Sequence, residues 1–397
     1  MKTIFQRQSL HRPTVAVVDL GKLARNARNL FQALGKPAFF CPMVKANAYG
    51  HGDLAVAKKL REAGVSHLGV GLIEEALHLR EDGDAQGILH FGMFDRRGAK
   101  VLVENAITPV ISSLDEVQIL SEEIETRALT EPFSVHLKIN TGMNRLGFEP
   151  KLALTAVKEI LADPKLKLAG IATHFASGET LSAKGSTAEE QLRTFESCVN
   201  ACKRLGARDF VQHIANSATA RELYLLGRTE FGIRPGIALY GIELPTESSP
   251  EKDVFSLEPV LRLESRIVHI QDVRQGARVS YGGHWQSSRD SKVGVVPIGY
   301  ADGYHRGLGG ASVLIHGRRA PIVGTICMDY FMVDLTDFGS QAKVGDVVVL
   351  LGEMQNDKIT AQELADRLGS IPYEILTSLS ERVPRLYNDD PQSASVF

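Results

Sequence analysis

In the first part of the chain, side chains that can act as acids, bases or cations directly follow short apolar runs. In chain order they are Lys45, Lys138, Arg145, His174, Asn216, Ser217 and Arg234. Lys45 stands between an apolar run and a tight turn with the sequence Asn-Ala-Tyr-Gly-His-Gly. Desolvation and neighbouring cations lower the pKa of a lysine in such a place and free its amine. Lys45 is therefore a candidate for Schiff-base chemistry.

Donors for a phosphate group occur in two later segments. Asn216 and Ser217 open a predicted helix, where backbone N–H groups and the helix dipole favour anions. Gly236 and Ile237 add further backbone N–H groups. Together with Tyr49, close to the lysine, these parts describe a site for pyridoxal 5'-phosphate (PLP) without a glycine-rich phosphate loop.

Strands that alternate with helices must position these side chains. The predicted strands are residues 39–44, 67–70, 88–91, 109–111, 135–139, 168–174, 211–214 and a weaker one ending near 233; the predicted helices are 20–34, 54–63, 74–81, 114–123, 152–161 and 189–205. This alternation implies a parallel sheet, and eight strands in about 200 residues favour a closed (β/α)8 barrel of the TIM type. Chemistry in such barrels takes place at the carboxyl ends of the strands, so the seven side chains should converge on one mouth. An open doubly wound sheet is the alternative, but the segment KANAYGHG (45–52) lacks its phosphate-binding pattern.

The character of the sequence changes in the second half. Residues 245–256 are polar and rich in turn formers, and we predict a linker there. Short β-type runs with frequent glycine follow, with one helix at 360–368, so we expect a mostly antiparallel β domain. The predicted domains are a barrel over 13–244 and a β domain over 257–397, and residues 1–12 are expected to pack with the second.

Composition limits the class of protein. The 397 residues carry 45 Lys plus Arg against 47 Asp plus Glu, without a dense basic run, so neither a nucleic-acid partner nor a membrane partner is expected. Four cysteines match neither a disulfide framework nor a zinc pattern, and we expect no metal. The first residues lack the pattern of an export signal, which favours a cytoplasmic small-molecule enzyme.

Nine short strings, in order along nearly the whole chain, resemble those of bacterial alanine racemase. They are VKANAYGHG (44–52), KINTGMNRLG (138–147), THFA (173–176), HIANSA (213–218), RPGIALYG (234–241), VSYGG (279–283), IGYADGY (298–304), ICMD (326–329) and RVPRLY (382–387). The resemblance implies a fold-type III PLP enzyme with a barrel and a C-terminal β domain. It also implies a head-to-tail homodimer whose two sites lie at the interface, and it makes alanine the substrate.

The resemblance implies two catalytic residues. Lys45 would hold PLP covalently and act on the α-proton of D-alanine, while Tyr281 from the other subunit would act on that of L-alanine. Racemisation removes a proton from one face and returns one to the other, so two acid–base groups must flank the cofactor. His174 and Arg234 would link the tyrosine to the pyridine nitrogen. An arginine keeps its own protons, so that nitrogen stays largely unprotonated.

The remaining site residues also follow from the resemblance. The substrate carboxylate is assigned to Arg145 and the backbone at Met328. Contacts to the cofactor are assigned to Lys45, Tyr49, His174, Asn216, Ser217, Arg234, Gly236, Ile237 and Tyr373. Tyr300 and Tyr373 would narrow the substrate entrance, with Glu179 and Arg306 in the outer corridor. Lys138 matches a position where some members carry a carbamylated lysine, which would turn a like-charged neighbour of Arg145 into an anion.

Two positions depart from the family pattern, and other functions remain open. Many members have Asp where this chain has Asn140, and many have Arg where Thr325 stands. The changes bear on substrate specificity, so a broad-specificity amino-acid racemase is the first alternative. A non-catalytic PLP-binding protein is the second, although the residues after 257 argue against it. An alanine racemase would supply D-alanine for peptidoglycan or serve alanine catabolism.

Overall fold

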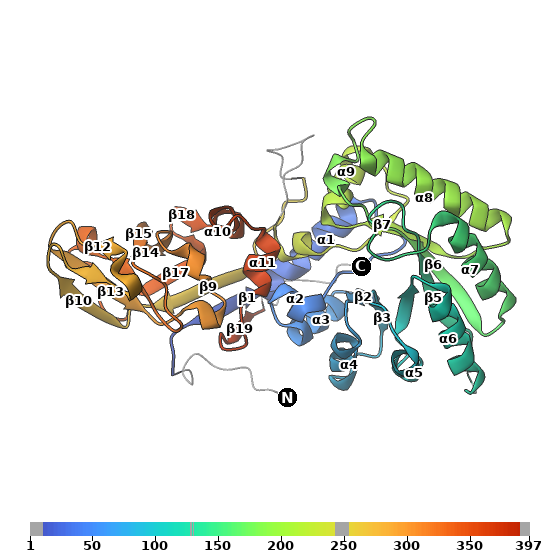
Figure 1. Ribbon diagram of the computed structural model, residues 1–397, viewed down its shortest axis with the longest axis horizontal. Coiled ribbons are helices and arrows are strands. Elements are labelled where there is room, and N and C mark those ends of the chain that lie inside the picture. Colours follow the sequence, from blue (N-terminus) through green and yellow to red (C-terminus); the bar gives the residue numbers. More distant parts are fainter. Residues whose placement is uncertain (1–10, 128, 130, 243–253, 390–397) are drawn as a thin grey trace. The chain divides into compact units, whose positions relative to one another are not determined.

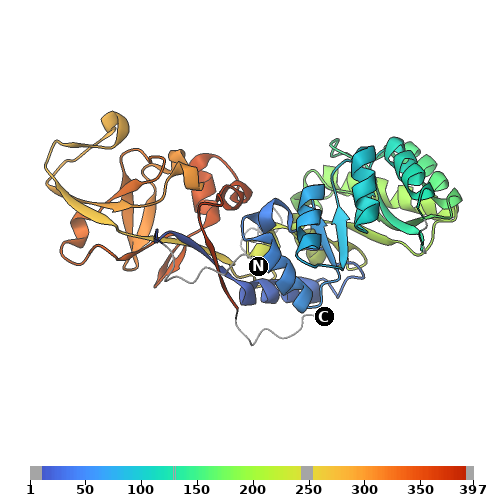
Figure 2. The same ribbon diagram turned by 90° about the horizontal axis from the view of Figure 1, so that it is seen from below.

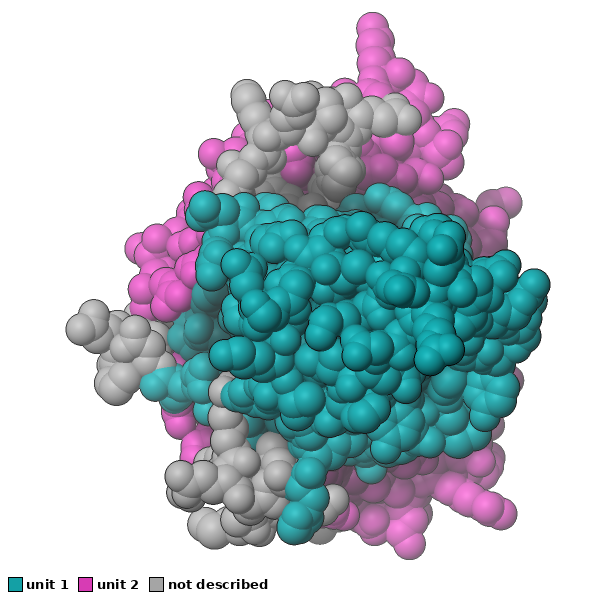
Figure 3. Space-filling model, turned by 90° about the vertical axis from the view of Figure 1, so that its left-hand side faces the viewer, with its two compact units in different colours: residues 1–22, 49–52, 259–392 teal, residues 23–48, 53–258, 393–397 magenta. Residues whose placement is uncertain are grey.

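The computed structural model describes residues 11–127, 129, 131–242 and 254–389. The chain divides into two compact units, which Figure 3 shows in two colours. Unit 1 comprises residues 1–22, 49–52 and 259–392, and unit 2 comprises residues 23–48, 53–258 and 393–397. Most of the predicted linker, and most of residues 1–12, lie outside the described residues. The domain limits 13–244 and 257–397 stay a prediction.

Unit 2 contains a ring of parallel strands. Its strands are β2 (His67–Val70), β3 (Gly87–His90), β4 (Thr108–Ile111), β5 (Phe133–Lys138), β6 (Leu166–Ala172), β7 (Val211–Ala215) and β8 (Gly232–Ile233), paired in that order. The predicted first strand, residues 39–44, forms isolated bridges only, because Pro42 has no N–H to donate. The Cys41 N–H still donates to Ile233 O at 2.9 Å, and the Val44 N–H donates to Gly69 O at 2.9 Å. These bonds close the ring, which confirms the predicted TIM-type barrel.

Helices lie outside this ring, as Figures 1 and 2 show. They are α1 (Leu20–Ala33), which begins in unit 1, α3 (Asp53–Glu62), α4 (Ile73–Glu81), α5 (Arg96–Glu104), α6 (Leu114–Glu125), α7 (Pro150–Ala162), α8 (Thr187–Arg204) and α9 (Ser217–Leu225), with 3-10 turns η2 (Gly178–Thr180) and η3 (Ile237–Tyr240). Asp19 caps α1, since its Oδ1 accepts from Lys22 N at 2.8 Å, as expected. The sequence pattern did not predict α5, whose start depends on capping of Gly98 N by the Asp95 carboxylate.

Unit 1 is built on a mostly antiparallel sheet in the order β10-β13-β16-β15-β14-β17-β9-β1-β19, with β18 beside β17. The strands are β1 (Val15–Asp19), β9 (Leu261–Arg266), β10 (His269–Val273), β13 (Ser291–Val296), β14 (Ser312–Ile315), β15 (Arg318–Val323), β16 (Phe331–Asp334), β17 (Val347–Met354), β18 (Asp357–Ile359) and β19 (Arg385–Asn388). A separate pair is formed by β11 (Arg278–Val279) and β12 (Trp285–Gln286). The mostly antiparallel β fold is therefore confirmed.

Short helical segments complete unit 1. They are α10 (Ala361–Leu368), α11 (Pro372–Thr377), η4 (Tyr281–Gly283), η5 (Tyr300–Asp302), η6 (Arg306–Leu308) and η7 (Thr336–Phe338). β1 runs parallel to β19 and antiparallel to β9, so residues 15–19 belong to the sheet of this unit. Nearby, Arg12 Nη1 donates to Asp302 Oδ1 at 2.8 Å. No helix in the described ranges is long and apolar enough to cross a membrane.

Candidate active site

Lys45 begins α2 (Lys45–Tyr49), a single turn of left-handed helix. The four residues after Lys45 have φ angles between 50° and 53°. Each non-glycine residue in this region costs roughly 1–2 kcal/mol, so other contacts must hold the turn. One of them is the Ala48 N–H, which donates to Val44 O at 2.9 Å. The turn starts where the first barrel strand ends, which places Lys45 at the barrel mouth.

Glu75 on α4 fastens this turn from the neighbouring loop. Its Oε1 accepts from Ala46 N at 2.6 Å, and its Oε2 accepts from Gly71 N at 2.8 Å and Leu72 N at 3.1 Å. The carboxylate thus ties the residue after Lys45 to the loop that follows β2. Sequence reasoning missed this residue, although a glutamate at the third helical position is the signature of a capping box.

Cations gather around Lys45 at the strand ends of unit 2. Although solvent reaches Lys45, burial and then the charge of Arg145 lower the pKa of its amine, and Glu75 opposes them. Burial, Arg145, Arg234 and Lys45 together lower the pKa of the Lys138 amine to about 8. An anion bound here would offset the repulsion among these cations, so the cluster favours the binding of anions.

Arg234 is buried, and its terminal nitrogens bond to groups of the barrel. Nη1 donates to His213 O at 2.6 Å and to His213 Nδ1 at 3.0 Å. Nη2 lies 2.9 Å from Thr173 O, 3.3 Å from His174 Nδ1 and 3.5 Å from Ile214 O. Within the described part of the chain, the structure gives the Nε–H of Arg234 no acceptor. One donor therefore remains available on a guanidinium that is otherwise fixed.

The contact with Arg234 sets the proton position on His174. A guanidinium only donates, so His174 Nδ1 accepts and the neutral ring carries its proton on Nε2. The ring is neutral because burial, followed by the charge of Arg234, lowers the pKa of His174 to about 3. His174 therefore presents an N–H donor on the side away from Arg234.

A group of donors surrounds the start of α9. Asn216 caps the helix, because its Oδ1 accepts from Thr219 N at 2.9 Å. Its amide nitrogen lies 3.5 Å from His174 Nε2, and because both nitrogens carry protons when His174 Nδ1 accepts from Arg234, this contact is not a hydrogen bond. The buried Ser217 Oγ accepts from Gly236 N at 3.0 Å and from Ala238 N at 3.1 Å. These bonds hold the segment with Gly236 and Ile237 against the helix start. First-turn N–H groups have no partner inside the helix, so the arrangement suits an anion.

The loop that carries Arg145 is organised by Asn140. Its Oδ1 accepts from Gly142 N at 3.2 Å and from Asn144 N at 3.0 Å, and its Nδ2 donates to Asn144 Oδ1 at 2.9 Å. Asparagine can hold the loop in this way without a carboxylate, which offers a physical reason for the departure at residue 140. Arg145 itself is exposed at the end of this loop.

Within unit 1, Tyr49 and Tyr373 lie together. Their ring centroids are 6.1 Å apart, and Tyr49 is buried. Tyr373 lies on α11, a helix that the sequence pattern did not predict because a turn and a half carries too few apolar positions to show a period. Gly50 packs so closely here that a Cβ would lie 2.1 Å from Leu376 O. Tyr49 and Tyr373, each predicted to contact the cofactor, are therefore brought together.

Tyr281 is presented on a braced backbone in unit 1. Ser280 Oγ donates to Thr325 O at 2.6 Å, and Thr325 Oγ1 donates to Tyr281 O at 2.9 Å. Gly324 packs against the same segment, since a Cβ there would lie 2.8 Å from Val279 O. Tyr281 is nevertheless 72% exposed. A fixed backbone thus carries an exposed phenol.

The other predicted residues of unit 1 fall into two places. The Ala301 N–H donates to Met328 O at 3.1 Å, which puts the Met328 segment beside Tyr300, and both side chains are exposed. Arg306 and Thr325 line a separate cavity of about 370 Å³ together with His284, Trp285, Gly309, Gly310, Ile322 and Gly324. Glu179 lies in η2 of unit 2.

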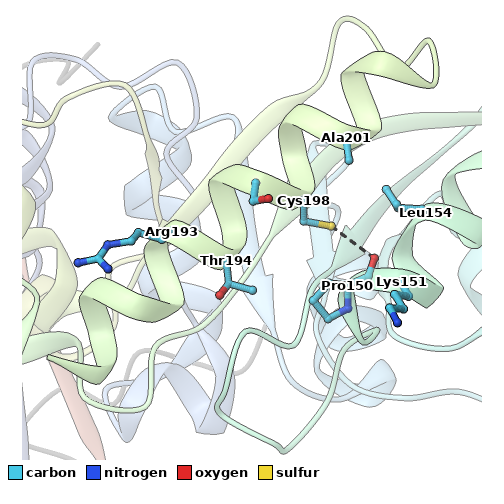
Figure 4. Close-up of a pocket in the computed structure, with 8 residues that line it drawn as sticks. Pro150, Lys151, Leu154, Arg193, Thr194, Cys198 and Ala201 are labelled. Atoms are coloured by element: carbon cyan, nitrogen blue, oxygen red, sulfur yellow. Dashed lines mark hydrogen bonds between the residues drawn. The ribbon is translucent and has the colours of Figure 1, made fainter. Parts of the chain in front are cut away.

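A second hollow lies on unit 2 and contains none of the predicted site residues. It has a volume of about 410 Å³ and is lined by Pro150, Lys151, Leu154, Arg193, Thr194, Ser197, Cys198 and Ala201 from α7 and α8 (Figure 4). The Cys198 thiol points to Pro150 O at 3.7 Å, an ordinary packing contact between the two helices. Among the described residues, no group of three or more His, Cys, Asp or Glu side chains is placed to hold a metal ion.

The fold and the lysine-centred cation cluster define a class, that of barrel enzymes with an additional β domain. Comparison with known proteins defines the family. The alanine racemase N-terminal domain family matches residues 18–244, and the C-terminal domain family matches residues 260–387. The chain belongs to the alanine racemase family, and it is an isomerase by this full-length relationship.

Individual relatives match along almost their full lengths. The chain is 37% identical over 380 residues to alanine racemase of Desulfovibrio desulfuricans, covering 96% of this chain and 99% of that one. It is 38% identical over 391 residues to alanine racemase of Sorangium cellulosum, covering 95% of this chain and 100% of that one. Alanine racemase of Clostridium difficile 630 has a similar structure, with a TM-score of 0.88 at 33% identity and coverage of 96% and 97%. The structure of alanine racemase from Bacillus anthracis with bound L-Ala-P has a TM-score of 0.86 at 33% identity. The match covers 96% of this chain and 96% of that one.

Proposed function

We propose that this protein interconverts L-alanine and D-alanine with PLP as its cofactor. The observation that carries the proposal is the arrangement of Arg234. Its terminal N–H groups bond to the barrel, and its Nε–H has no acceptor among the described residues. An unprotonated pyridine nitrogen is an acceptor that this donor suits. The residues at the mouth therefore fit PLP on the side of its ring nitrogen.

The phosphate group also fits residues of unit 2. The start of α9, with the Ser217 hydroxyl and the backbone N–H of Ile237, offers donors at a helix N-terminus, while the Gly236 N–H holds Ser217 Oγ in place. We assign Asn216 to the same turn, and Tyr49 and Tyr373 to the phosphate by family resemblance. Lys45 supplies the amine for covalent attachment, and its lowered pKa raises the fraction that is neutral and nucleophilic.

Two acid–base residues divide the proton transfer between them. PLP, when bound, supplies an electron sink that acidifies the α-hydrogen of an attached amino acid. Lys45 moves the proton on the D-alanine side, and Tyr281 moves it on the L-alanine side. The Nε2–H of His174 is the donor that stabilises the phenolate of Tyr281. Arg145 and the backbone at Met328 bind the substrate carboxylate.

Tyr281 acts, in this proposal, in the site of a second copy of the chain. Tyr281 is 72% exposed, although the backbone that carries it is braced by Ser280 and Thr325. An exposed side chain on a fixed backbone is suited to completing a site elsewhere. We therefore propose a homodimer whose two sites are shared between barrel and β domain.

Lys138 is proposed to carry a carbamate. Its pKa of about 8 leaves a substantial fraction of neutral amine near physiological pH, which is the form that reacts with carbon dioxide. The resulting anion would lie among Arg145, Arg234 and Lys45, whose charges disfavour an ammonium ion there. A crystal structure of the holoenzyme tests this: extra density on the Lys138 amine supports the modification, and a bare amine in clear density contradicts it.

One observation favours the broader alternative, an amino-acid racemase of wide specificity. Thr325 stands where many family members have arginine, and it lines the cavity of about 370 Å³ with Arg306. Tyr300 and Tyr373 are proposed to narrow the entrance, with Glu179 and Arg306 further out. A wider outer corridor would admit longer side chains.

The experiment is a racemisation assay of purified, PLP-loaded protein with L-alanine, L-lysine and L-arginine. We expect alanine to be turned over at least about tenfold faster than the basic amino acids, because a missing or extra group in a fitted pocket changes rates by this order. Comparable rates would establish the broad alternative. Bound PLP without turnover of any substrate would establish the non-catalytic one.

The biological setting follows from the same reaction. We propose a cytoplasmic enzyme that supplies D-alanine for peptidoglycan, with alanine catabolism as the other use of the reaction. A deletion strain that grows only with added D-alanine supports the first use. Normal growth of that strain, except on alanine as sole carbon source, supports the second.

A further inference from the structure

Two histidines lie inside the barrel below the proposed site. His136 on β5 and His213 on β7 are buried. Side chains two apart on a strand share a face, so His136 points into the barrel one layer beneath Lys138. The ring of Phe39 packs against both, with centroid distances of 5.5 Å to His136 and 4.8 Å to His213. Neither histidine was among the predicted site residues.

The two rings form a hydrogen-bonded chain with Arg234. Arg234 Nη1 lies 3.0 Å from His213 Nδ1, and His213 Nε2 lies 2.8 Å from His136 Nδ1. The guanidinium can only donate, so His213 Nδ1 must accept and the proton of a neutral His213 must be on Nε2. His213 then donates to His136 Nδ1, which places the His136 proton on Nε2. The direction of the whole chain is thus set at Arg234.

Both imidazoles are held neutral. Burial, followed by His67 and Arg234, lowers the pKa of His136 to about 3. Burial, followed by the charge of Arg234, lowers the pKa of His213 well below its usual range. A second proton on either ring would remove the acceptor that the chain requires. The chain therefore keeps one orientation over the physiological pH range.

We infer that His136 is a positioning residue for Arg234 and acts on it through His213. By accepting the Nε2 proton of His213, His136 keeps the Nδ1 lone pair of that ring turned to the guanidinium. Without this acceptor, His213 can reverse its ring or shift its proton, and an N–H would then face the N–H of Arg234. The contact between Arg234 and the cofactor rests on the proposed function, whereas the hydrogen-bonded chain itself does not.

Gly170 on β6 leaves room for the His136 ring. A Cβ at residue 170 would lie 2.3 Å from His136 Nδ1 and 2.5 Å from its Cε1. Contacts this short do not occur, so a side chain at 170 must displace the ring. Gly170→Ala therefore moves the acceptor of the chain without changing its chemistry.

Proton positions can be measured without any substitution in the chain. The purified full chain, labelled with ¹⁵N only at histidine and measured with and without added PLP, reports the protonated nitrogen of each ring through its chemical shifts. We expect both rings to be neutral with the proton on Nε2 between pH 6 and 9, and the signals lost in His136→Asn and His213→Gln identify them. A proton on Nδ1 of His213, or a charged His136, overturns the inference.

Variants separate positioning from packing. His136→Leu removes the acceptor, whereas His136→Asn keeps an oxygen near the place of Nδ1. His67→Leu is the matched control, because His67 also packs on Phe39, at 5.2 Å between centroids, but bonds to Ser66 instead of the chain. These three variants and Gly170→Ala are loaded with PLP and compared by the absorbance maximum of the cofactor and by kcat and KM for L-alanine.

We expect His136→Leu and Gly170→Ala to lower kcat about tenfold and to shift the absorbance maximum, with KM changed less than about twofold, as for other supporting hydrogen bonds. His136→Asn should recover most of kcat, and His67→Leu should leave kcat within about twofold of the parent. Equal effects of His136→Leu and His67→Leu overturn the inference. If His136→Leu does not fold, the ¹⁵N shifts of the parent still decide the inference. If the parent neither binds PLP nor racemises alanine, that result counts against the proposed function alone, and the ¹⁵N shifts again decide the inference.

Discussion

Arg234 shows how burial and fixed donors turn common side chains into a site. Burial lowers the pKa of its guanidinium to about 10, which still leaves it charged at neutral pH. Its donors then determine which nitrogens of His174 and His213 are protonated. The charge of one residue thereby sets the hydrogen-bonding roles of two others.

The buried histidines make a residue-scale prediction about acid stability. Below pH 6.5 His136 takes up a proton in the unfolded chain, whereas in the folded chain its pKa of about 3 keeps it neutral until the pH is much lower. The unfolded state therefore binds more protons, and the free energy of unfolding falls as the pH is lowered through this window. Between pH 6.5 and 4.5 the parent should lose about 2 kcal/mol more than His136→Asn.

Urea unfolding of the two apoproteins at equal concentration measures this difference. The substitution changes stability at every pH, so only the change with pH is informative. Parallel curves for the parent and His136→Asn between pH 6.5 and 4.5 would contradict a neutral His136 in the folded state.

At this scale, sequence position was a good guide to the barrel side of the candidate site. Lys45, His174 and Arg234 could be predicted because each ends an apolar run, and the carboxyl ends of barrel strands meet at one mouth. Glu75 and His136 could not, since their importance depends on through-space contacts with a turn and with His213. Their neighbours in the sequence show no such relationship.

At the scale of elements, the left-handed turn α2 is the clearest departure from local preference. Its sequence, KANAY, contains good right-handed helix formers, and nothing in it demands a positive φ. Contacts from Glu75 and from the strand end hold the turn in place. Non-local pairing likewise decides β1, whose partners β9 and β19 lie more than 240 residues further along the chain. Such choices cannot be predicted from a local pattern.

Strain in this turn can be measured by substitution. Ala46→Gly should raise the free energy of unfolding by about 1 kcal/mol, because Ala46 is exposed, keeps its N–H bond to Glu75 and loses only its positive-φ penalty. Ala201→Gly, in the right-handed helix α8, is the control and should lower it by about 1 kcal/mol. Urea unfolding measures both, and a loss of stability in both would show that α2 carries no such strain.

At the scale of the whole molecule, the proposed dimer predicts complementation. Lys45→Ala and Tyr281→Phe should each abolish most racemisation of L-alanine. If one copy supplies the lysine and the other the tyrosine, a mixed dimer contains one doubly altered site and one intact site. Equal mixing with free exchange of subunits should therefore restore about a quarter of the parent activity.

The same mixture also tests whether one chain supplies both residues of its own site. If Lys45 and Tyr281 of one chain act together, no mixed dimer has an intact site, and the mixture stays as inactive as its components. Exchange is verified by separating differently tagged subunits before the assay. Full activity of Tyr281→Phe alone would remove the tyrosine from the mechanism.

The two-domain plan was open to prediction because a period of alternating strands and helices gives way to glycine-rich β runs. The antiparallel order of the sheet in unit 1, which places β17 next to β9, was not, because it depends on pairings between distant strands. The exposure of Tyr281 on a braced backbone is also a property of the folded unit.

Attachment of PLP to Lys45 is the proposal on which the others depend. Its most direct test is borohydride reduction of the purified protein, followed by mass mapping of its peptides. We expect that the visible absorbance of the cofactor disappears and that the peptide containing Lys45 carries reduced PLP, with no label in Lys45→Ala. Label on another lysine such as Lys138, or no label at all, would contradict it.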